Sequence, residues 1–189
     1  MATRSGTFGP SAIATPANGV TLARVVMTPL LLAWIVSSGA SWPAEALWIV
    51  LSLTDGIDGF LARRHGSTRS GAFLDPLADK FLVLGAMVCL VHIDVFGWVP
   101  VALIAAREIA MSVYRSVVGT KGVSIPARRS AKLKTVVQDL AVGFALFPPI
   151  GDHHAGVARL VLWVAVALTL YTGAEYLRAA TKKESTSAL

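Results

Sequence analysis

The sequence predicts an all-α membrane protein with six transmembrane helices and both termini in the cytoplasm. Hydrophobic residues make up 54% of the 189 residues and charged residues only 15%, whereas soluble globular proteins carry about 25% charged residues. The mean hydropathy of +0.64 excludes intrinsic disorder, and a single cysteine, Cys89, excludes a disulfide scaffold. The net charge of +6 suits anionic lipid headgroups or phosphorylated substrates. The chain is too apolar for a basic nucleic-acid-binding module.

Six segments are long and apolar enough to cross a bilayer, whose hydrocarbon core takes about 20 residues of helix. They are Val20–Ser38, Pro43–Arg63, Gly71–His92, Val95–Val118, Ala131–Ile150 and Val157–Ala180. We therefore expect a cytoplasmic or interfacial segment over residues 1–17, a six-helix domain over residues 18–180 and a polar tail over residues 181–189. The rings near the ends of these segments are expected at the membrane interface; they belong to Trp42, Trp48, Trp98 and Tyr176.

The basic residues predict which helix ends face the cytoplasm, because short cytoplasmic loops collect Lys and Arg. Connections 64–70 and 119–130 and the C-terminal end contain several basic residues, whereas connections 39–42 and 93–94 contain none. Arg159 is the one basic residue beside the last turn. This asymmetry predicts that both termini and the two basic connections lie in the cytoplasm.

Four aspartates lie near the cytoplasmic ends of the second and third predicted spans. Asp55 and Asp58 are three residues apart and Asp75 and Asp79 are four apart, so each pair shares one face of its helix. Ionisable groups within a span are costly and usually face a cavity or the bundle interior. Divalent cations would relieve the repulsion among four carboxylates, and oxygen ligands suit Mg²⁺. The pattern therefore predicts a site for two Mg²⁺ ions, with Mn²⁺ as the alternative.

Small residues accompany these acids. Gly59 and Ala62 each lie four residues after one acid of the second span, and Gly71 lies four residues before the first acid of the third. Small residues let another helix or a ligand approach the backbone closely. The acidic faces are therefore expected to be open to a ligand.

Two other interpretations of the acids stay open. The carboxylates could form ion pairs that only hold helices together, with Arg24, Lys80 and Arg107 as partners. They could also line a transporter for divalent cations. Transporters usually place such sites at the midplane and show internal repeats, whereas these acids lie near helix ends and no repeat is visible.

The acidic segment resembles the signature of the CDP-alcohol phosphotransferases. The matching positions are Asp55, Asp58, Gly59, Ala62, Arg63, Gly71, Asp75 and Asp79. The connection between Arg63 and Gly71 is one residue shorter than the usual family pattern. The resemblance implies a six-helix enzyme, commonly a homodimer, in the cytoplasmic membrane of a bacterium with its active site facing the cytoplasm.

The resemblance also implies the chemistry. CDP-diacylglycerol would be the donor, and the four aspartates would hold two Mg²⁺ ions at its phosphates. An acceptor hydroxyl would attack the phosphorus next to the lipid, Asp79 would take the hydroxyl proton as general base, and CMP would leave. The CDP moiety would bind at Asp55, Gly59, Ala62, Arg63 and Gly71.

Basic residues in the later spans indicate an anionic acceptor, because Arg suits bidentate phosphate contacts and Lys acts as a point charge. The candidates for binding the acceptor phosphate are Arg107, Arg115, Lys132 and Lys134. Residues 106–138 resemble the phosphatidylglycerophosphate synthase branch of the family, which implies sn-glycerol 3-phosphate as the acceptor. Inositol phosphate, or phosphatidylglycerol in a cardiolipin synthase, stays open as an alternative.

Overall fold

The computed structural model describes residues 16–65, 69–120 and 129–187, with side chains over 19–54, 77–114 and 132–175. This part of the chain is helical apart from short turns, which confirms the all-α prediction. The helices are α1 (Pro16–Ser38), α2 (Trp42–His65), α3 (Arg69–His92), α4 (Trp98–Thr120), α5 (Arg129–Leu146), α6 (Pro148–Gly151) and α7 (Ala155–Ser187). Six of them are long, and each overlaps most of one of the six predicted spans.

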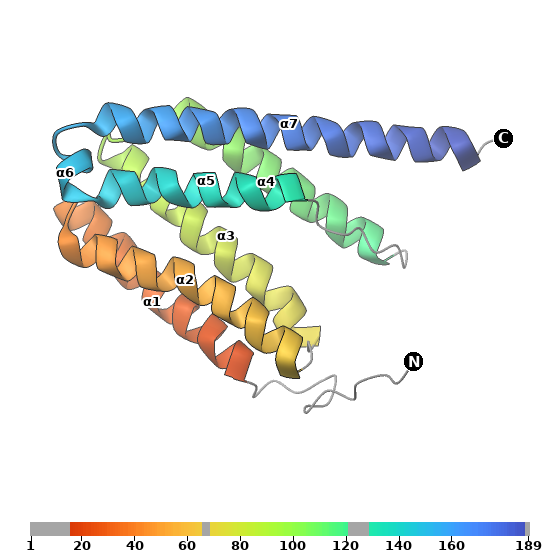
Figure 1. Cartoon of the computed structure of the whole chain (residues 1–189), viewed down its shortest axis with the longest axis horizontal. Helices are drawn as coiled ribbons and strands as arrows, with labels where there is room; N and C mark the ends of the chain where they lie inside the picture. The colour runs from red at the N-terminus through yellow and green to blue at the C-terminus, as the bar shows by residue number, and fades with distance from the viewer. Residues whose placement is uncertain (1–15, 66–68, 121–128, 188–189) are drawn as a thin grey trace.

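The long helices form two groups joined at one end of the molecule (Figure 1). α1 packs against α2 and α3, α5 packs along α7, and α4 lies against α3 and α7. Contacts of α5 with α2 and α3 join the groups. We call the end that holds turns 39–41, 93–97 and 147–154 the turn end. We call the opposite end, where α2 ends and α3 begins, the site end.

The apolar core lies toward the turn end. Its largest fully buried members include Leu31, Ile35, Met87, Leu90 and Leu146, and all of them belong to one contiguous cluster. The buried polar residues instead lie farther from the turn end than the core residues of the same helices, and they are Thr21, Arg24, Thr28, Glu108, Lys134, Gln138, Thr169 and Thr172. The fold therefore concentrates its buried polar groups on one side of its apolar core.

The fifth predicted span is shorter than expected. α5 ends at Leu146, and Phe147 takes an extended conformation with φ −71° and ψ 111° before the short helix α6. Phe147 precedes Pro148, and a residue before proline is sterically driven out of the helical region. At the other extreme, α7 continues to Ser187, so most of the tail expected at residues 181–189 is helical.

One of the expected interface rings lies in the core instead. Trp42 and Trp98 are 62% and 72% exposed at the starts of their helices, as expected. Trp48 is only 2% exposed, and its placement at the interface was wrong. Its indole lies against Gly143 of α5, where an added Cβ would come within 3.5 Å of Nε1. The glycine leaves the room that lets this large ring enter the interior.

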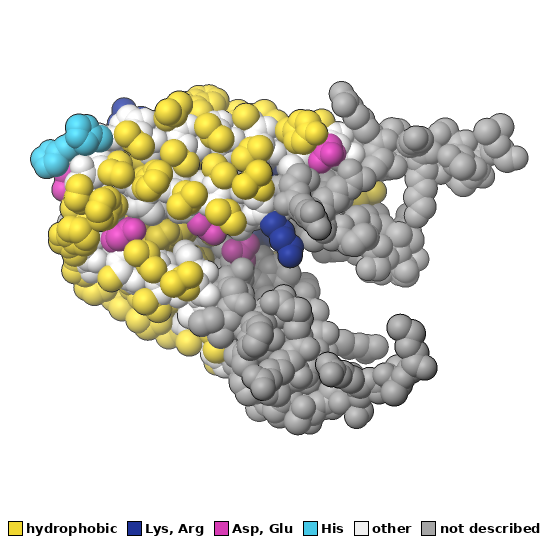
Figure 2. Space-filling model, in the orientation of Figure 1, with side chains coloured by type: hydrophobic (Ala, Val, Ile, Leu, Met, Phe, Trp, Pro, Cys, Tyr) yellow, Lys and Arg dark blue, Asp and Glu magenta, His cyan; other side chains and the backbone are white. Residues whose placement is uncertain are grey.

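Two stretches of the described helices are long and apolar enough to cross a membrane, Gly19–Ser38 and Ala155–Glu175. Large apolar side chains also cover much of the visible surface in Figure 2, and they are exposed on each of the six long helices. Leu22, Val26, Leu53 and Leu160 are among the most exposed. An apolar surface of this extent favours contact with lipid.

Candidate active site

The four aspartates of the predicted metal site lie on α2 and α3, where these consecutive helices approach their connection. Asp55 and Asp58 belong to the last turns of α2, and Asp75 and Asp79 to the first turns of α3. α1 packs against both helices. The backbone therefore places both pairs at the site end, with each pair on one face of its own helix.

The structure describes only one of these four side chains. Asp79 is partly buried. The side chains at Asp55, Asp58, Gly59, Ala62, Arg63, Gly71 and Asp75 lie outside the described residues. Within the described part of the chain no group of three or more potential metal ligands occurs, so the predicted two-metal site stays a prediction.

A buried arginine from α1 adjoins the acidic segment of α2. Arg24 is 1% exposed, and its Nε donates to Oγ1 of Thr54 over 3.3 Å. Thr54, which directly precedes Asp55, donates in turn to the Leu51 carbonyl over 2.6 Å. Arg24 therefore places a positive charge inside the helix interface next to the first predicted metal ligand.

A second buried charged cluster joins α4 to α5. Oε1 of Glu108 accepts from Nη1 of Arg107 over 3.1 Å and also from Nζ of Lys134. The three side chains are 10%, 11% and 5% exposed for Arg107, Glu108 and Lys134. We call these three residues the bridged cluster. One carboxylate oxygen thus fixes two cations that the sequence had assigned to the acceptor phosphate.

α7 completes this arrangement with two threonines. Nη2 of Arg107 donates to Oγ1 of Thr172 over 2.9 Å, and Nε2 of Gln138 donates to Oγ1 of Thr169 over 3.1 Å. Nε of Arg107 is buried without a hydrogen-bond partner among the described residues. A buried donor without a partner costs free energy, so this nitrogen suits an oxygen of a bound anion.

Lys80 adds a third cation near the bridged cluster. It lies close enough to Glu108 and Lys134 to interact electrostatically with both. Lys80 directly follows Asp79 on α3, which connects the cluster to the predicted catalytic helix. Three positive charges therefore act on the Glu108 carboxylate, and a group of cations favours an anionic ligand.

The structure places the four residues predicted to bind the acceptor phosphate in different surroundings. Arg107 and Lys134 come together on Glu108. Lys132 is exposed, and two residues along a helix from Lys134 it points away from it. Arg115 lies on α4, and its side chain is outside the described residues.

Comparison with known proteins supports the family that the acidic segment resembles. The family described as CDP-alcohol phosphatidyltransferase matches residues 14–171, most of the chain. The chain belongs to this family. The protein is therefore a CDP-alcohol phosphatidyltransferase and an enzyme, which favours catalysis over the transporter considered from the sequence.

Several bacterial proteins are similar to this transferase over most of its length. A "Probable phosphatidylglycerophosphate synthase" of Mycobacterium tuberculosis is 38% identical over 89% of this chain and 82% of its own length. A CDP-diacylglycerol–glycerol-3-phosphate 3-phosphatidyltransferase of Rickettsia typhi is 35% identical over 86% of this chain and 94% of its own. The protein of that name in Escherichia coli K12 is 39% identical over 85% and 92%.

Sequence reasoning missed the partners that organise the cations of this transferase. Glu108 was visible as an acid beside Arg107 within an apolar span, and an intramembrane acid is itself a signal. Thr169 and Thr172 gave a weaker signal, since they are polar residues three apart on one face of an apolar helix. Nothing in the sequence paired that face with α4 and α5.

Proposed function

We propose that this transferase moves the phosphatidyl group of CDP-diacylglycerol to a hydroxyl of sn-glycerol 3-phosphate, giving phosphatidylglycerophosphate and CMP. The observation that carries the acceptor is the grouping of three cations, Lys80, Arg107 and Lys134, that interact with the Glu108 carboxylate. The names of the relatives support the same acceptor. We propose further that six helices cross a bacterial cytoplasmic membrane with the site end facing the cytoplasm.

The proposed reaction forms one bond and breaks one. The acceptor hydroxyl oxygen attacks the phosphorus next to diacylglycerol, the bond from that phosphorus to the CMP oxygen breaks, and Asp79 takes the hydroxyl proton. Positioning accounts for much of the rate, because a carboxylate is a weak base and gains effectiveness from proximity. The acceptor phosphate binds at Arg107 and Lys134. Lys80, which interacts electrostatically with Lys134, directly follows Asp79 on α3 and so connects this phosphate site to the proposed base.

The carboxylates of α2 and α3 fit a divalent cation by their chemistry, since Mg²⁺ prefers oxygen ligands and shares its shell with substrate phosphates. We propose that Asp55, Asp58, Asp75 and Asp79 hold two Mg²⁺ ions. Bound Mg²⁺ would supply charge neutralisation at the phosphates. The small residues and Arg63 beside these acids would receive the CDP moiety.

CMP release from purified protein tests the proposal. The assay contains CDP-diacylglycerol and Mg²⁺, with glycerol 3-phosphate, inositol phosphate, phosphatidylglycerol or serine as the acceptor in separate reactions. We expect release only with glycerol 3-phosphate and only with a divalent ion. Release with inositol phosphate or phosphatidylglycerol instead would keep the family chemistry and overturn the acceptor.

Two lysines of α5 provide a matched pair for the acceptor site. Lys134→Met should raise the KM for glycerol 3-phosphate by about tenfold or more, because a charge-assisted hydrogen bond contributes about 1.5–3 kcal/mol. Lys132→Met removes an exposed lysine two residues away and should change that KM far less. The KM for CDP-diacylglycerol should stay within about twofold in both variants, because neither lysine is among the residues proposed to bind the CDP moiety.

A further inference from the structure

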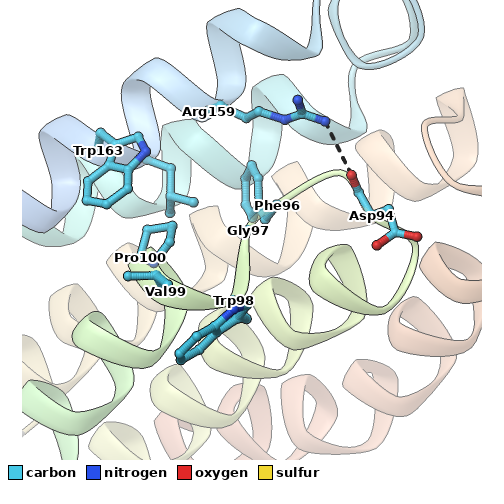
Figure 3. A pocket seen from close by; sticks show the side chains of 9 residues that line it. Asp94, Phe96, Gly97, Trp98, Val99, Pro100, Arg159 and Trp163 are labelled. Atoms are coloured by element: carbon cyan, nitrogen blue, oxygen red, sulfur yellow. Dashed lines mark hydrogen bonds between the residues drawn. The ribbon is translucent and has the colours of Figure 1, made fainter.

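A separate pocket lies at the turn end, far along the helices from the bridged cluster. It is formed by the turn between α3 and α4 together with the first turns of α7, and its volume is about 540 Å³. Figure 3 shows its labelled lining, with Arg159 and Trp163 of α7 in the upper part of the view and Trp98, at the start of α4, below them. Volumes of about 300–1,000 Å³ are typical of small-molecule sites. The lining combines one cation, Arg159, and one acid, Asp94, with aromatic rings, which is a composition suited to an amphiphile with a polar headgroup.

Arg159 is held in place by backbone carbonyls. Its Nε donates to the carbonyl of Val95 over 2.7 Å, and its Nη2 donates to the carbonyl of Asp94 over 3.2 Å. Asp94 has a φ of +60°, which is uncommon for a residue other than glycine. Arg159 therefore connects the α3–α4 turn, with its uncommon backbone conformation, to α7. An arginine carries five N–H donors, and three of them remain after these two bonds. The guanidinium is therefore oriented and still able to bind a ligand.

Arg159 forms no ion pair with a described residue. The carboxylate of Asp94 also lines the pocket, but the bonds from Arg159 go to main-chain carbonyls. Arg159 is exposed, and Trp98 and Trp163 are 72% and 50% exposed beside it. Tryptophan rings favour the boundary between lipid chains and headgroups, and arginine binds phosphate through its planar fork.

We propose that this pocket binds a phospholipid of the leaflet opposite the active site. The headgroup phosphate lies on the free N–H groups of Arg159, and the apolar part of the lipid lies along Trp98 and Trp163. The bound lipid bridges the α3–α4 turn and α7 and so stabilises the packing at this end. The inference rests on the membrane placement proposed above and does not depend on which acceptor the enzyme uses.

Thermal unfolding in an uncharged detergent tests the proposal with two lipids of equal acyl chains. Dioleoylphosphatidylglycerol carries the phosphate, and dioleoylglycerol lacks it. We expect the phospholipid to raise the Tm of the full chain above the value in dioleoylglycerol by on the order of 5 °C at saturating lipid. Arg159→Gln should lose most of this difference, and equal Tm values in the two lipids for the unchanged chain would overturn the proposal.

Two variants keep the test decisive if Arg159→Gln unfolds. Trp163→Leu leaves both arginine hydrogen bonds possible and should reduce the difference between the lipids; a full difference in this variant would overturn the pocket. Lys80→Gln removes a cation at the site end and should keep the difference. Loss in Lys80→Gln with retention in Arg159→Gln would place the phospholipid at the active site and contradict the proposal.

The lipid measurement and the enzyme assay test the two proposals independently. CMP release depends on the donor, the acceptor and the acids at the site end. The Tm difference depends on lipid binding at the turn end and is measured without any substrate. An inactive preparation with an intact Tm difference would count against the proposed reaction alone. An active preparation without the difference would count against the lipid pocket alone.

Discussion

The two ends of this helical enzyme are held together by different kinds of contact. At the turn end the interior is an apolar cluster that includes Leu31, Ile35 and Leu90. Toward the site end the same helices bury Arg24, Glu108 and Lys134. Apolar contacts are non-directional, whereas a buried charge depends on each of its partners. The difference indicates that the turn end serves mainly stability and that the site end combines stability with ligand binding.

This comparison extends to the two arginines that join α7 to other helices. Arg107 is nine-tenths buried and bonds to a carboxylate and a threonine. Arg159 is exposed and bonds to two main-chain carbonyls. Each is positioned by the fold and each retains N–H groups for an anion. Substitutions at one end should therefore change kinetics, and substitutions at the other should change stability alone.

The largest expected effect is on turnover. Asp79→Asn should reduce CMP release by about 10³-fold, because a positioned general base contributes about 10²–10⁴-fold. Asp94→Asn is the matched control at the turn end, where asparagine tolerates the positive φ of this position. It should retain turnover. Full activity of Asp79→Asn in the CMP assay would remove Asp79 from its proposed role.

A smaller effect is expected at the bridged cluster. Glu108→Gln leaves Lys134 buried without its carboxylate and should lower the stability of the ligand-free protein by about 3 kcal/mol. Glycerol 3-phosphate should restore more of the Tm in this variant than in the unchanged chain, because its phosphate supplies the missing negative charge. Differential scanning fluorimetry with and without the acceptor measures both values.

Glu45→Gln is the control for this experiment. Glu45 is a partly buried acid near the turn end, and no ion pair joins it to a cation among the described residues. Its substitution should neither lower the Tm by a comparable amount nor create a response to glycerol 3-phosphate. If glycerol 3-phosphate raised the Tm of Glu108→Gln no more than that of Glu45→Gln, the bridged cluster would not be the phosphate site.

The smallest effect is expected from overpacking at the turn end. A Cβ added at Gly151 would lie 2.4 Å from the Ala145 carbonyl oxygen and 2.6 Å from the Ala40 Cβ. Gly151→Ala should therefore cost about 2 kcal/mol of stability with both KM values unchanged. Gly156→Ala, where a Cβ meets nothing within 4 Å, should leave the Tm unchanged or slightly raised. A raised acceptor KM in Gly151→Ala would contradict the division between the ends.

The sequence predicted the helical class and the positions of the long helices because apolar segments of this length leave few alternatives in lipid. It missed the end of α5 because the apolar run continues through Phe147, where the proline that follows determines the backbone. It also misplaced Trp48, since proximity to a span end does not reveal a glycine on a neighbouring helix.

The candidate site could be predicted only where its residues share a helix. Asp75 and Asp79 are related by helical periodicity, which is readable from spacing. The contact of Glu108 with Lys134 joins residues 26 apart, and that of Arg107 with Thr172 joins residues 65 apart. Such contacts depend on how three helices pack, and periodicity within one helix carries no information about its neighbours.

The unequal lengths of α5 and α7 have a consequence for what lies outside the bilayer. α7 has 33 residues and α5 has 18, and at a rise of 1.5 Å per residue they measure about 50 and 27 Å. The hydrocarbon core of a bilayer is about 30 Å thick. Figure 1 shows that α7 extends well beyond the end of α5. With the membrane placement proposed above, the end of α7 is a stiff spacer, and a fluorophore or affinity tag joined to it would be held about 20 Å from the apolar layer.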